Sequence, residues 1–341
     1  MRSSARAAVL ISTAMMTACG EGAMAPTSQD SPVSFATAAA SANACPNPKG
    51  HPGGKIVDVL QGASFPWGVA VRDDGLSYFT ELFNSRVGIT DTKNRSIMGY
   101  IGTGALPTGI AFSPDGTRAY TANQGDNTVT VLDPATGTAI GSVAIGGSSP
   151  FSVQVSPDGS LIYSGNNDNT LSVIDAQTNQ VIKTVTVGFA TNAFAVDEAG
   201  RMLYASSFVS GTVSEIDIFT SKVIRTFTIG GTTQGLALNK KGTRLFVANQ
   251  GGYLTEIDLR SGQIVAQIAL GGVAFGVGVT ADDNEAWITL PLDGKVQTFD
   301  LKKRKIKGTL VVGGEPRRVA FSETGKIGAI TNAQGYITFV R

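Results

Sequence analysis

Short runs of alternating apolar and polar residues recur through most of the chain. In one unit, an apolar run of period two at Ile110–Phe112 leads into the turn Pro114–Gly116. A second run follows at Ala119–Ala122 and a third at Val129–Asp133, and the next unit adds a fourth at Val181–Val187. A period of two indicates a half-buried β-strand. Each unit therefore predicts four short strands.

The unit recurs seven times with a nearly constant period. Each repeat has a turn whose last residue lies 41 to 43 residues before that of the next turn. These reference residues are Gly75, Gly116, Gly159, Gly200, Gly242, Asp283 and Gly325. Four strands in about 42 residues are typical of a propeller blade and not of one turn of a helical solenoid. We therefore predict an all-β fold, a seven-bladed β-propeller with four antiparallel strands in each blade.

The two ends of the repeated region complement each other. The seventh repeat supplies strands at Arg318–Phe321, Ile327–Ile330 and Tyr336–Val340 and lacks a fourth. At the other end, Ile56–Gly62 has the fourth-strand pattern without the three strands that should precede it. A strand edge stays unpaired unless this N-terminal strand pairs into the last blade. We expect that pairing to close the ring.

Several motifs inside the repeats match a known repeat family. The turns at Ser113–Gly116 and Ser156–Gly159 read Ser-Pro-Asp-Gly. Two second strands read Tyr120-Thr-Ala-Asn123 and Phe246-Val-Ala-Asn249. Third strands end in an aspartate that we expect to accept local backbone hydrogen bonds, as at Asp133, Asp175, Asp217 and Asp258. Over residues 55–341 the chain resembles the YVTN family of seven-bladed β-propellers, which implies the fold but not the activity.

The start of the chain has the pattern of an export signal. Arg2 and Arg6 give a positive beginning, and the apolar stretch 7–18 has the length of a signal-peptide core, too short to span a bilayer. Met16-Thr-Ala-Cys19 resembles a bacterial lipobox, although an aliphatic residue is usual where Met16 stands. The resemblance implies cleavage before Cys19 and a diacylglycerol on its sulfur. We predict that residues 1–18 are a lipoprotein signal peptide.

Ordinary secretion is the alternative to a lipid anchor. Ala23-Met-Ala25 resembles a signal peptidase I site, but Pro26 directly behind it disfavours cleavage. Gly20 follows the predicted lipidated cysteine, whereas Asp at that place is the usual inner-membrane retention signal. The resemblance therefore favours the outer membrane. We expect a lipid-anchored protein of the bacterial cell envelope, on the periplasmic or the surface face.

The segment that follows has the composition of a tether. Residues 19–50 are rich in Ala, Ser, Thr, Pro and Asn and hold few large apolar side chains, which is typical of a flexible linker. We predict a lipid-anchored tether over 19–50 and the propeller over 51–341. With Cys19 lipidated, Cys45 has no disulfide partner within the chain, and we interpret it as an incidental thiol.

Composition and charge exclude several classes of protein. Charged residues make up 16% of the chain, too few for a disordered or coiled-coil protein. The chain has 27 basic and 26 acidic residues, and removal of Arg2 and Arg6 leaves a net charge of −1. Nucleic-acid binding through bulk charge is therefore not expected. One His and two Cys leave little material for a metal site, and we expect neither a metal nor a cofactor.

One position varies while the framework around it repeats. It lies eight residues before each reference residue, and its occupants are Trp67, Thr108, Phe151, Asn192, Gln234, Phe275 and Arg317. The following residue is small in six repeats, which is consistent with crowding near the ring axis, and it is Arg318 in the seventh. In propellers, residues so placed surround the mouth of the central channel, where ligands commonly bind; this is an analogy at the level of fold.

Two interpretations of this ring stay open. Trp, Phe and Arg are enriched in binding hot spots, which favours a ligand site. The alternative is that the side chains merely plug the channel. Arg317 and Arg318 would need acceptors if buried, which points to an anionic group at the mouth.

A second ring of positions lies between the second and third strands. It holds Glu81, Ser207 and Leu290 in three repeats and otherwise Asn, at Asn123, Asn166, Asn249 and Asn332. Glu81 is the only carboxylate of this ring, so it is either a ligand for a cation or a hydroxyl, or a solvated loop carboxylate. The stretches 123–127 and 166–169 faintly resemble calcium loops but lack the ligand alternation of an EF-hand, so turn chemistry explains them.

One run of like charge stands out, at Lys302–Lys305 with Lys307. It falls in the turn between the third and fourth strands, on the outer rim and on the face of the Asp-Gly turns. Attraction of anionic lipid or nucleic acid is one interpretation, and a solvated turn is the other. The near-zero net charge favours the solvated turn.

The leading hypothesis is a membrane-tethered binding module, expected to be a monomer, that engages an unidentified protein, peptide or small ligand at the channel mouth. No residue is assigned a catalytic role. The alternative is a propeller enzyme of lyase or hydrolase type, because Trp67–Glu81 resembles blades of streptogramin lyase. Those lyases use a catalytic His with Glu, and the only His here, His51, lies before the first strand. A third and weaker hypothesis is nucleic-acid binding, with bases stacked on Trp67 and Phe151 beside Arg317.

Overall fold

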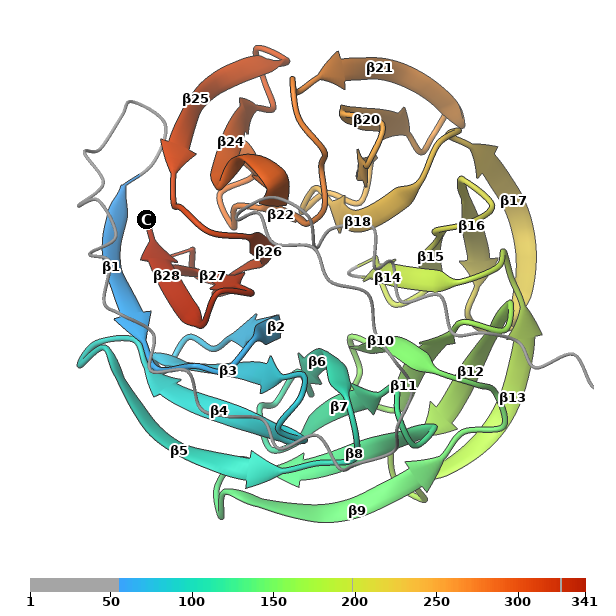
Figure 1. The fold of residues 1–341 in the computed structure, drawn as a ribbon. Helices are drawn as coiled ribbons and strands as arrows, with labels where there is room; N and C mark the ends of the chain where they lie inside the picture. The colour runs from blue at the N-terminus through green and yellow to red at the C-terminus, as the bar shows by residue number, and fades with distance from the viewer. Residues whose placement is uncertain (1–54, 198, 326) are drawn as a thin grey trace, which may run out of the picture. The chain divides into compact units, whose positions relative to one another are not determined.

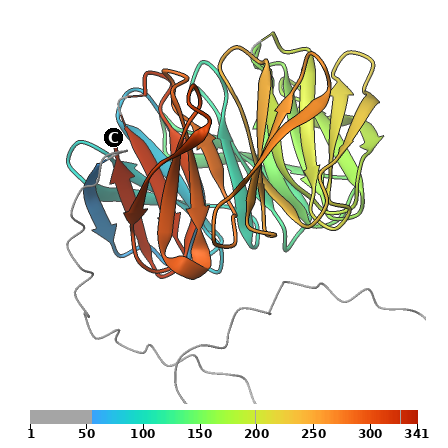
Figure 2. The same cartoon turned by 90° about the horizontal axis from the view of Figure 1, so that it is seen from above.

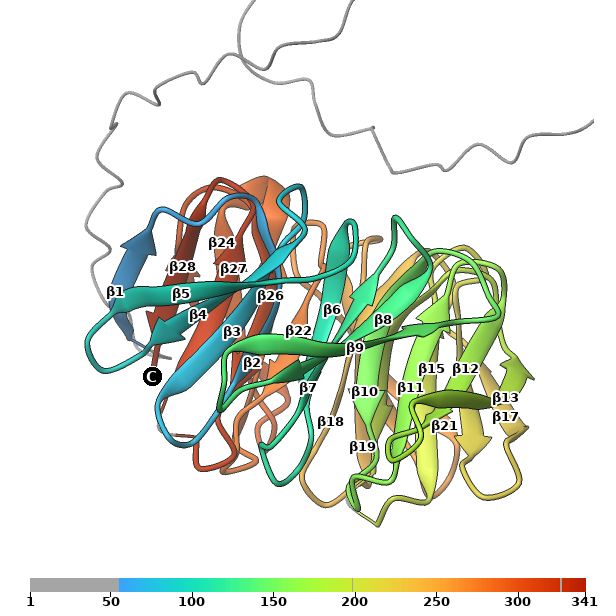
Figure 3. The same cartoon turned by 90° about the horizontal axis from the view of Figure 1, so that it is seen from below.

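The described part of the chain forms a closed ring of sheets. The computed structural model describes residues 55–197, 199–325 and 327–341, and within them seven antiparallel sheets of four strands stand around a central axis (Figure 1). Seen edge-on, the strands of the blades run between the two faces of the ring (Figures 2 and 3). The predicted all-β, seven-bladed propeller is confirmed.

Each blade runs from an innermost strand beside the channel to an outermost strand at the rim (Figure 1). The innermost strands are β2 (Pro66–Val71), β6 (Pro107–Phe112), β10 (Pro150–Val155), β14 (Thr191–Val196), β18 (Thr233–Leu238), β22 (Val277–Val279) and β26 (Pro316–Phe321). The second strands are β3 (Leu76–Glu81), β7 (Ala119–Asn123), β11 (Leu161–Asn166), β15 (Met202–Ser207), β19 (Arg244–Asn249), β23 (Glu285–Leu290) and β27 (Gly328–Asn332). We number the blades 1 to 7, from the one that begins with β2.

The outer half of each blade is equally regular. The third strands are β4 (Arg86–Asp91), β8 (Thr128–Asp133), β12 (Thr170–Asp175), β16 (Thr212–Asp217), β20 (Tyr253–Asp258), β24 (Lys295–Asp300) and β28 (Tyr336–Val340). The outermost strands are β5 (Ser96–Gly102), β9 (Thr138–Ala144), β13 (Gln180–Thr186), β17 (Lys222–Thr228), β21 (Gln263–Ala269), β25 (Lys305–Val311) and β1 (Ile56–Gln61). The helical content of the described residues is the 3₁₀ turn η1 (Pro291–Asp293), and no helix there is long and apolar enough to cross a membrane.

The N-terminal strand closes the ring, as predicted. β1 pairs antiparallel with β28, and the last blade has the order β1-β28-β27-β26. Lys55 and Arg341 extend this pairing, because the backbone N–H of each donates to the carbonyl of the other at 2.9 and 3.0 Å. The last blade therefore has four strands although the C-terminal segment supplies only three.

Alternating apolar side chains fill the space between neighbouring blades. Tyr120 and Val129 of blade 2 pack in one cluster with Ile162 of blade 3, and all three are buried. Complete burial of an aliphatic or aromatic side chain of this size contributes about 1.5–3 kcal/mol. Because each blade shares its core with the next, the stability of one blade depends on its neighbours.

The strand register defines which loops share a face. The first residue of an innermost strand lies opposite the last residue of the second strand, as in Pro66 with Glu81 and Pro316 with Asn332. The loop that enters each blade and the turn between its second and third strands therefore lie at the same end. We call this end the mouth face; the Asp-Gly turns lie at the opposite end.

Neighbouring innermost strands approach closely, and this explains the small residues that follow the variable position. A Cβ at Gly109 of blade 2 would lie 2.8 Å from the backbone nitrogen of Val153 in blade 3, and one at Gly68 would collide with the carbonyl of Thr108. The crowding at these two positions is against the backbone of the innermost strand of the next blade. Arg318 occupies this position in blade 7, where its side chain reaches across the channel instead.

The aspartates at the ends of the third strands stabilise the turns that follow. Asp175 accepts a hydrogen bond from the backbone N–H of Thr178 at 2.7 Å, and Asp258 accepts one from Ser261 at 2.8 Å. These backbone hydrogen bonds hold the pKa of both carboxyl groups below the usual value. The expectation of local backbone hydrogen bonds is confirmed at these turns.

Candidate functional site

The variable ring meets at the axis of the propeller. Its members lie at or just before the innermost strands: six are the second residue of such a strand, and Phe275 lies two residues before β22. Thr108, Asn192, Gln234, Phe275 and Arg317 are buried, whereas Trp67 and Phe151 keep partial exposure. We call these seven residues, together with Arg318, the channel cluster.

Aromatic rings form the middle of the channel cluster. The Trp67 ring contacts the Phe151 ring edge-on, with centroids 6.0 Å apart, and the Phe275 ring edge-on at 5.7 Å. Such edge-to-face pairs contribute about 0.5–1.5 kcal/mol beyond the burial of their area. One side chain of blade 1 thus links blades 3 and 6 across the axis.

Two arginines of blade 7 pack against these rings. The guanidinium of Arg317 lies 4.9 Å from the centre of the Trp67 ring and 5.3 Å from that of Phe275. It also forms an ion pair with Glu315 at 2.6 Å. The guanidinium of Arg318 lies 4.9 Å from the Phe275 ring and donates to the carbonyl of Asn192, across the channel, at 3.4 Å. Both arginines are in cation–π geometry.

The amide and hydroxyl side chains of the channel cluster form hydrogen bonds between neighbouring blades. Asn192 donates from its amide to the side-chain oxygen of Gln234 at 2.8 Å. Thr108 donates to the carbonyl of Phe151 in the next blade at 2.7 Å. These contacts connect blades 2 to 3 and 4 to 5, so the amide and hydroxyl groups serve the framework of the channel.

The channel cluster has more donors than acceptors. The indole Nε1 of Trp67 and the Nε of Arg317 are buried without a hydrogen-bond partner among the described residues. Burial lowers the pKa of Arg317, and it lowers the pKa of Arg318 to about 10, an effect to which the like charge of Arg317 adds. The environment therefore disfavours the two positive charges, and an additional acceptor or negative charge would stabilise them.

A series of aromatic rings joins the channel cluster to the surface. Phe65 stacks on Trp67 at 6.2 Å with an interplanar angle of 14°, and Phe83 packs on Phe65 at 4.9 Å. Phe83 lies in the mouth-face turn after β3, and 61% of it is exposed. Neither residue was predicted from the sequence to belong to the site. Phe65 stands two positions before Trp67, and this aromatic pair of period two was the available signal.

Glu81 has a different environment from the one expected of a solvated loop carboxylate, because it is fully buried. Its Oε2 pairs with Arg86 at 2.6 Å and accepts from Asn84 at 2.9 Å, and its Oε1 accepts from the backbone of Ser64 at 2.7 Å. Asn332 in blade 7 likewise accepts the backbone N–H of the incoming loop, at Glu315. The Glu81 carboxylate therefore connects two mouth-face loops.

The stretches that faintly resembled calcium loops form turns. Asp126 accepts from the backbone of Ala105 at 2.9 Å, and Asp168 accepts from the backbone of Ser148 at 2.8 Å. Each aspartate thus holds the entering loop of its own blade. Among the described residues, no group of three or more His, Cys, Asp or Glu side chains is placed to hold a metal ion.

The basic run lies in the turn between β24 and β25, and part of its charge is paired. Arg304 bonds to Glu256 of the preceding blade at 3.0 Å, and Lys307 forms an ion pair with Glu285. The backbone N–H groups of Lys302 and Lys303 donate to Asp300. The turn is thus held by specific ion pairs and is only partly a solvated segment.

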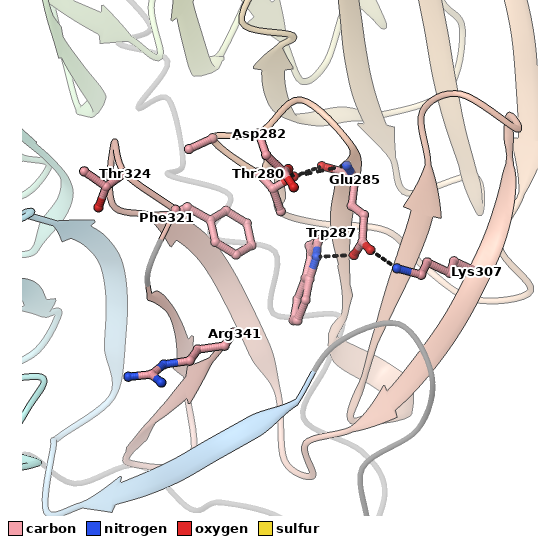
Figure 4. Close-up of a pocket in the computed structure, with 10 residues that line it drawn as sticks. Thr280, Asp282, Glu285, Trp287, Lys307, Phe321, Thr324 and Arg341 are labelled. Atoms are coloured by element: carbon pink, nitrogen blue, oxygen red, sulfur yellow. Dashed lines mark hydrogen bonds and ion pairs between the residues drawn. The ribbon is translucent and has the colours of Figure 1, made fainter.

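A pocket of about 430 Å³ lies between blades 6 and 7, on the face of the Asp-Gly turns (Figure 4). Trp287 and Phe321 pack edge-on within it at 5.5 Å. Glu285 accepts from the Trp287 indole at 3.1 Å and pairs with Lys307, while Arg341 extends away from this pair in Figure 4. This pocket was not predicted from the sequence. The Glu285 carboxylate and the Lys307 ammonium neutralise each other in this pocket.

The predicted lipidation site Cys19, with Cys45 and His51, lies outside the described residues, as do the predicted signal peptide and the predicted tether. The described residues contain neither His nor Cys. Because of this composition, the channel cluster has no imidazole or thiol to act as base or nucleophile. What the arrangement provides is aromatic surface and guanidinium groups, which suit binding.

Comparison with known proteins agrees with this fold. The repeat family described as "WD domain, G-beta repeat" matches residues 142–175, which extend from β9 through β12. Hydrazine synthase of Kuenenia stuttgartiensis is similar in structure, with a TM-score of 0.77 and 18% identity over 83% of this chain and 97% of that chain. At this identity the likeness concerns the fold alone. No curated protein matches the sequence. Together with the seven blades, these findings identify the chain as a β-propeller repeat protein.

Proposed function

We propose that this protein is a membrane-tethered binding module that engages a protein, peptide or small ligand at the mouth of its central channel. The observation that carries the proposal is the aromatic series from Phe83 through Phe65 to Trp67. It runs from an exposed ring on the mouth face to the axis, where the blades converge. Large aromatic residues and arginine are the residue types that most often dominate binding energy.

The membrane tether and the cell-envelope location are part of the same proposal. The lipobox-like Met16–Cys19 and the polar composition of residues 19–50 support them. A tether of that composition lets the propeller search for a partner near the membrane surface. Fixing a binding module at the membrane also raises its effective concentration toward other envelope components.

The enzyme alternative has less support. Glu81, the carboxylate in the segment that resembles a lyase blade, accepts hydrogen bonds from three groups and is fully buried. A general base must reach the proton that it abstracts. Nucleic-acid binding is also less favoured, because Trp67 is already packed against Arg317, Phe65 and two phenylalanine edges.

Photocrosslinking from two exposed phenylalanines tests the proposal. Phe83 lies on the mouth face, and Phe219 lies on the opposite face in the turn after β16, where 78% of it is exposed. Each is replaced in turn by p-benzoylphenylalanine in the full chain in living cells, and adducts are measured by intact mass so that small and large partners are both detected. We expect adducts from position 83 and only background from position 219. Equal crosslinking at both positions, or none at 83, contradicts a mouth-face site.

A further inference from the structure

We infer that the group recognised at the channel mouth is a carboxylate attached to an apolar body, with Arg318, Arg317 and the Trp67 indole as its donors. The inference rests on the proposed mouth-face binding site and adds the chemical class of the ligand.

The two guanidinium charges of the channel cluster are not both compensated. Arg317 has a carboxylate partner in Glu315 at 2.6 Å. Arg318 forms no ion pair with any described carboxylate, and the one hydrogen bond of its guanidinium to the described residues reaches the Asn192 carbonyl at 3.4 Å, near the limit for such a bond. The channel cluster therefore holds one guanidinium charge more than its neighbours compensate.

The channel cluster also holds buried hydrogen-bond donors that no described acceptor uses. The Trp67 Nε1 and Arg317 Nε groups are buried and donate to no described atom. An indole N–H and a guanidinium can only donate. The side-chain oxygen of Gln234 already accepts from Asn192. Because a buried donor without an acceptor is destabilising, the channel cluster gains most from a ligand that brings acceptors.

The positions of these donors favour a planar acceptor with two oxygens. The Arg317 guanidinium lies over the Trp67 ring, so the two unused donors belong to side chains in direct contact. A carboxylate has two acceptor oxygens in one plane, which suits a guanidinium fork and leaves lone pairs for an indole N–H. A metal cation or an amine would instead add to the uncompensated positive charge.

A ligand must reach these buried donors from the mouth face, and its apolar part must find a surface there. Neither unused nitrogen is open to solvent, so a carboxylate reaches them only when a neighbouring side chain shifts. Arg318 is partly exposed, and the single hydrogen bond of its guanidinium is long, so it is the side chain that we expect to move. A ligand entering from the mouth face would lay its apolar part along Phe65 and Phe83.

The test is a calorimetric titration of the purified full chain with 3-phenylpropionate and with its neutral isostere 3-phenylpropionamide. We expect the acid to bind at least about tenfold more tightly than the amide, because a hydrogen bond to a charged group contributes about 1.5–3 kcal/mol. In Arg318→Gln the acid should bind about tenfold or more weakly. Trp67→Phe, which keeps an aromatic ring and removes the indole N–H, should also weaken binding of the acid. Arg260→Gln, an exposed arginine on the opposite face, is the matched control and should bind as the wild type does.

The outcomes separate this inference from the proposed function. The inference that the ligand carries a carboxylate is overturned by any of three results: equal binding of acid and amide, absence of binding, or unchanged affinity of the acid for Arg318→Gln. If position 83 still crosslinks in those cases, the mouth-face site stands and only its ligand class is wrong. Circular dichroism checks that the variants are folded; if Arg318→Gln does not fold, Arg318→Lys takes its place, and loss of the acid-to-amide preference in that variant supports the guanidinium fork.

Discussion

The hydroxyl of Thr331 in blade 7 donates a hydrogen bond to the carbonyl of Trp67 in blade 1, at 2.7 Å. The same hydroxyl accepts the backbone N–H of Arg318 at 3.1 Å. One fully buried side chain therefore connects the two blades at the closure of the ring and fixes the backbone of two channel-cluster residues. Thr80 and Thr289 make the equivalent bonds to the next blade in blades 1 and 6.

Removal of this hydroxyl should destabilise the propeller. Thr331→Val keeps the shape of the side chain and leaves the Trp67 carbonyl and the Arg318 N–H without partners. We expect a loss of about 1–3 kcal/mol in the free energy of unfolding. Urea unfolding followed by circular dichroism measures it. Thr136→Val, at an exposed turn position, is the control and should change stability by less than about 0.5 kcal/mol.

Removal of the closing strand should open the ring. Deletion of residues 55–62 takes away β1 and leaves the edge of β28 unpaired. We expect a lower melting temperature and faster proteolysis within blade 7. A deletion of equal length at 36–43, in the predicted tether, serves for comparison. If both deletion variants have the melting temperature of the wild type, β1 does not contribute to the stability of the ring.

The buried Glu81 should contribute to stability and not to cation binding. Glu81→Gln removes the negative charge opposite Arg86, which is itself partly exposed, so we expect destabilisation of about 1–3 kcal/mol. Denaturant unfolding measures it, with Glu323→Gln at an exposed turn as the control. A melting temperature that rises with calcium in the wild type and not in Glu81→Gln would instead support a ligand role.

The turn aspartates should make stability fall in acid. Backbone hydrogen bonds lower the pKa of Asp175, Asp217 and Asp258 from the usual 3.8. A carboxyl whose folded pKa is depressed stabilises the fold fully above its unfolded pKa, and this contribution is lost as the pH falls through the folded pKa. The melting temperature should therefore drop below about pH 4. In Asp258→Asn the drop should be smaller, with the two proteins compared from pH 7 to pH 2.

Replacement of Cys19 should separate the protein from the membrane. In Cys19→Ser the sulfur that would carry the diacylglycerol is absent, so labelling with a radioactive or clickable fatty acid should disappear and the protein should leave the membrane fraction. Cys45→Ser is the matched control and should keep both the label and the membrane partition. Unchanged partition of Cys19→Ser would contradict the lipid anchor.

The sequence predicted the features that local patterns determine. Strand alternation and the turn spacing give the number of blades, and the unmatched Ile56–Gly62 strand indicates the closure. The position of Trp67 near the axis follows from its place in the repeat. These features depend on contacts within one blade or between adjacent ones, which recur with the period.

Contacts between distant repeats could not be predicted in the same way. Arg318 meets Asn192 from 126 positions away, and the sequence does not show which of seven inward side chains will touch. Within blade 1, a solvated loop carboxylate was one of the two interpretations of Glu81, because its turn is a loop in sequence, yet Arg86 and Ser64 of the same blade enclose it in space. Such partners depend on rotamers and on the geometry of the closed ring.

The backbone exchange between Lys55 and Arg341 has a consequence for the topology of the molecule. Because the two ends of the ring meet within a single hydrogen-bonded pair, a short peptide linker could join them without rearranging a blade. New termini could then be placed at an exposed turn such as the one that ends at Gly159 or Gly242. Circularly permuted chains of this kind would keep the channel cluster intact and would allow a reporter domain to be fused beside any chosen blade.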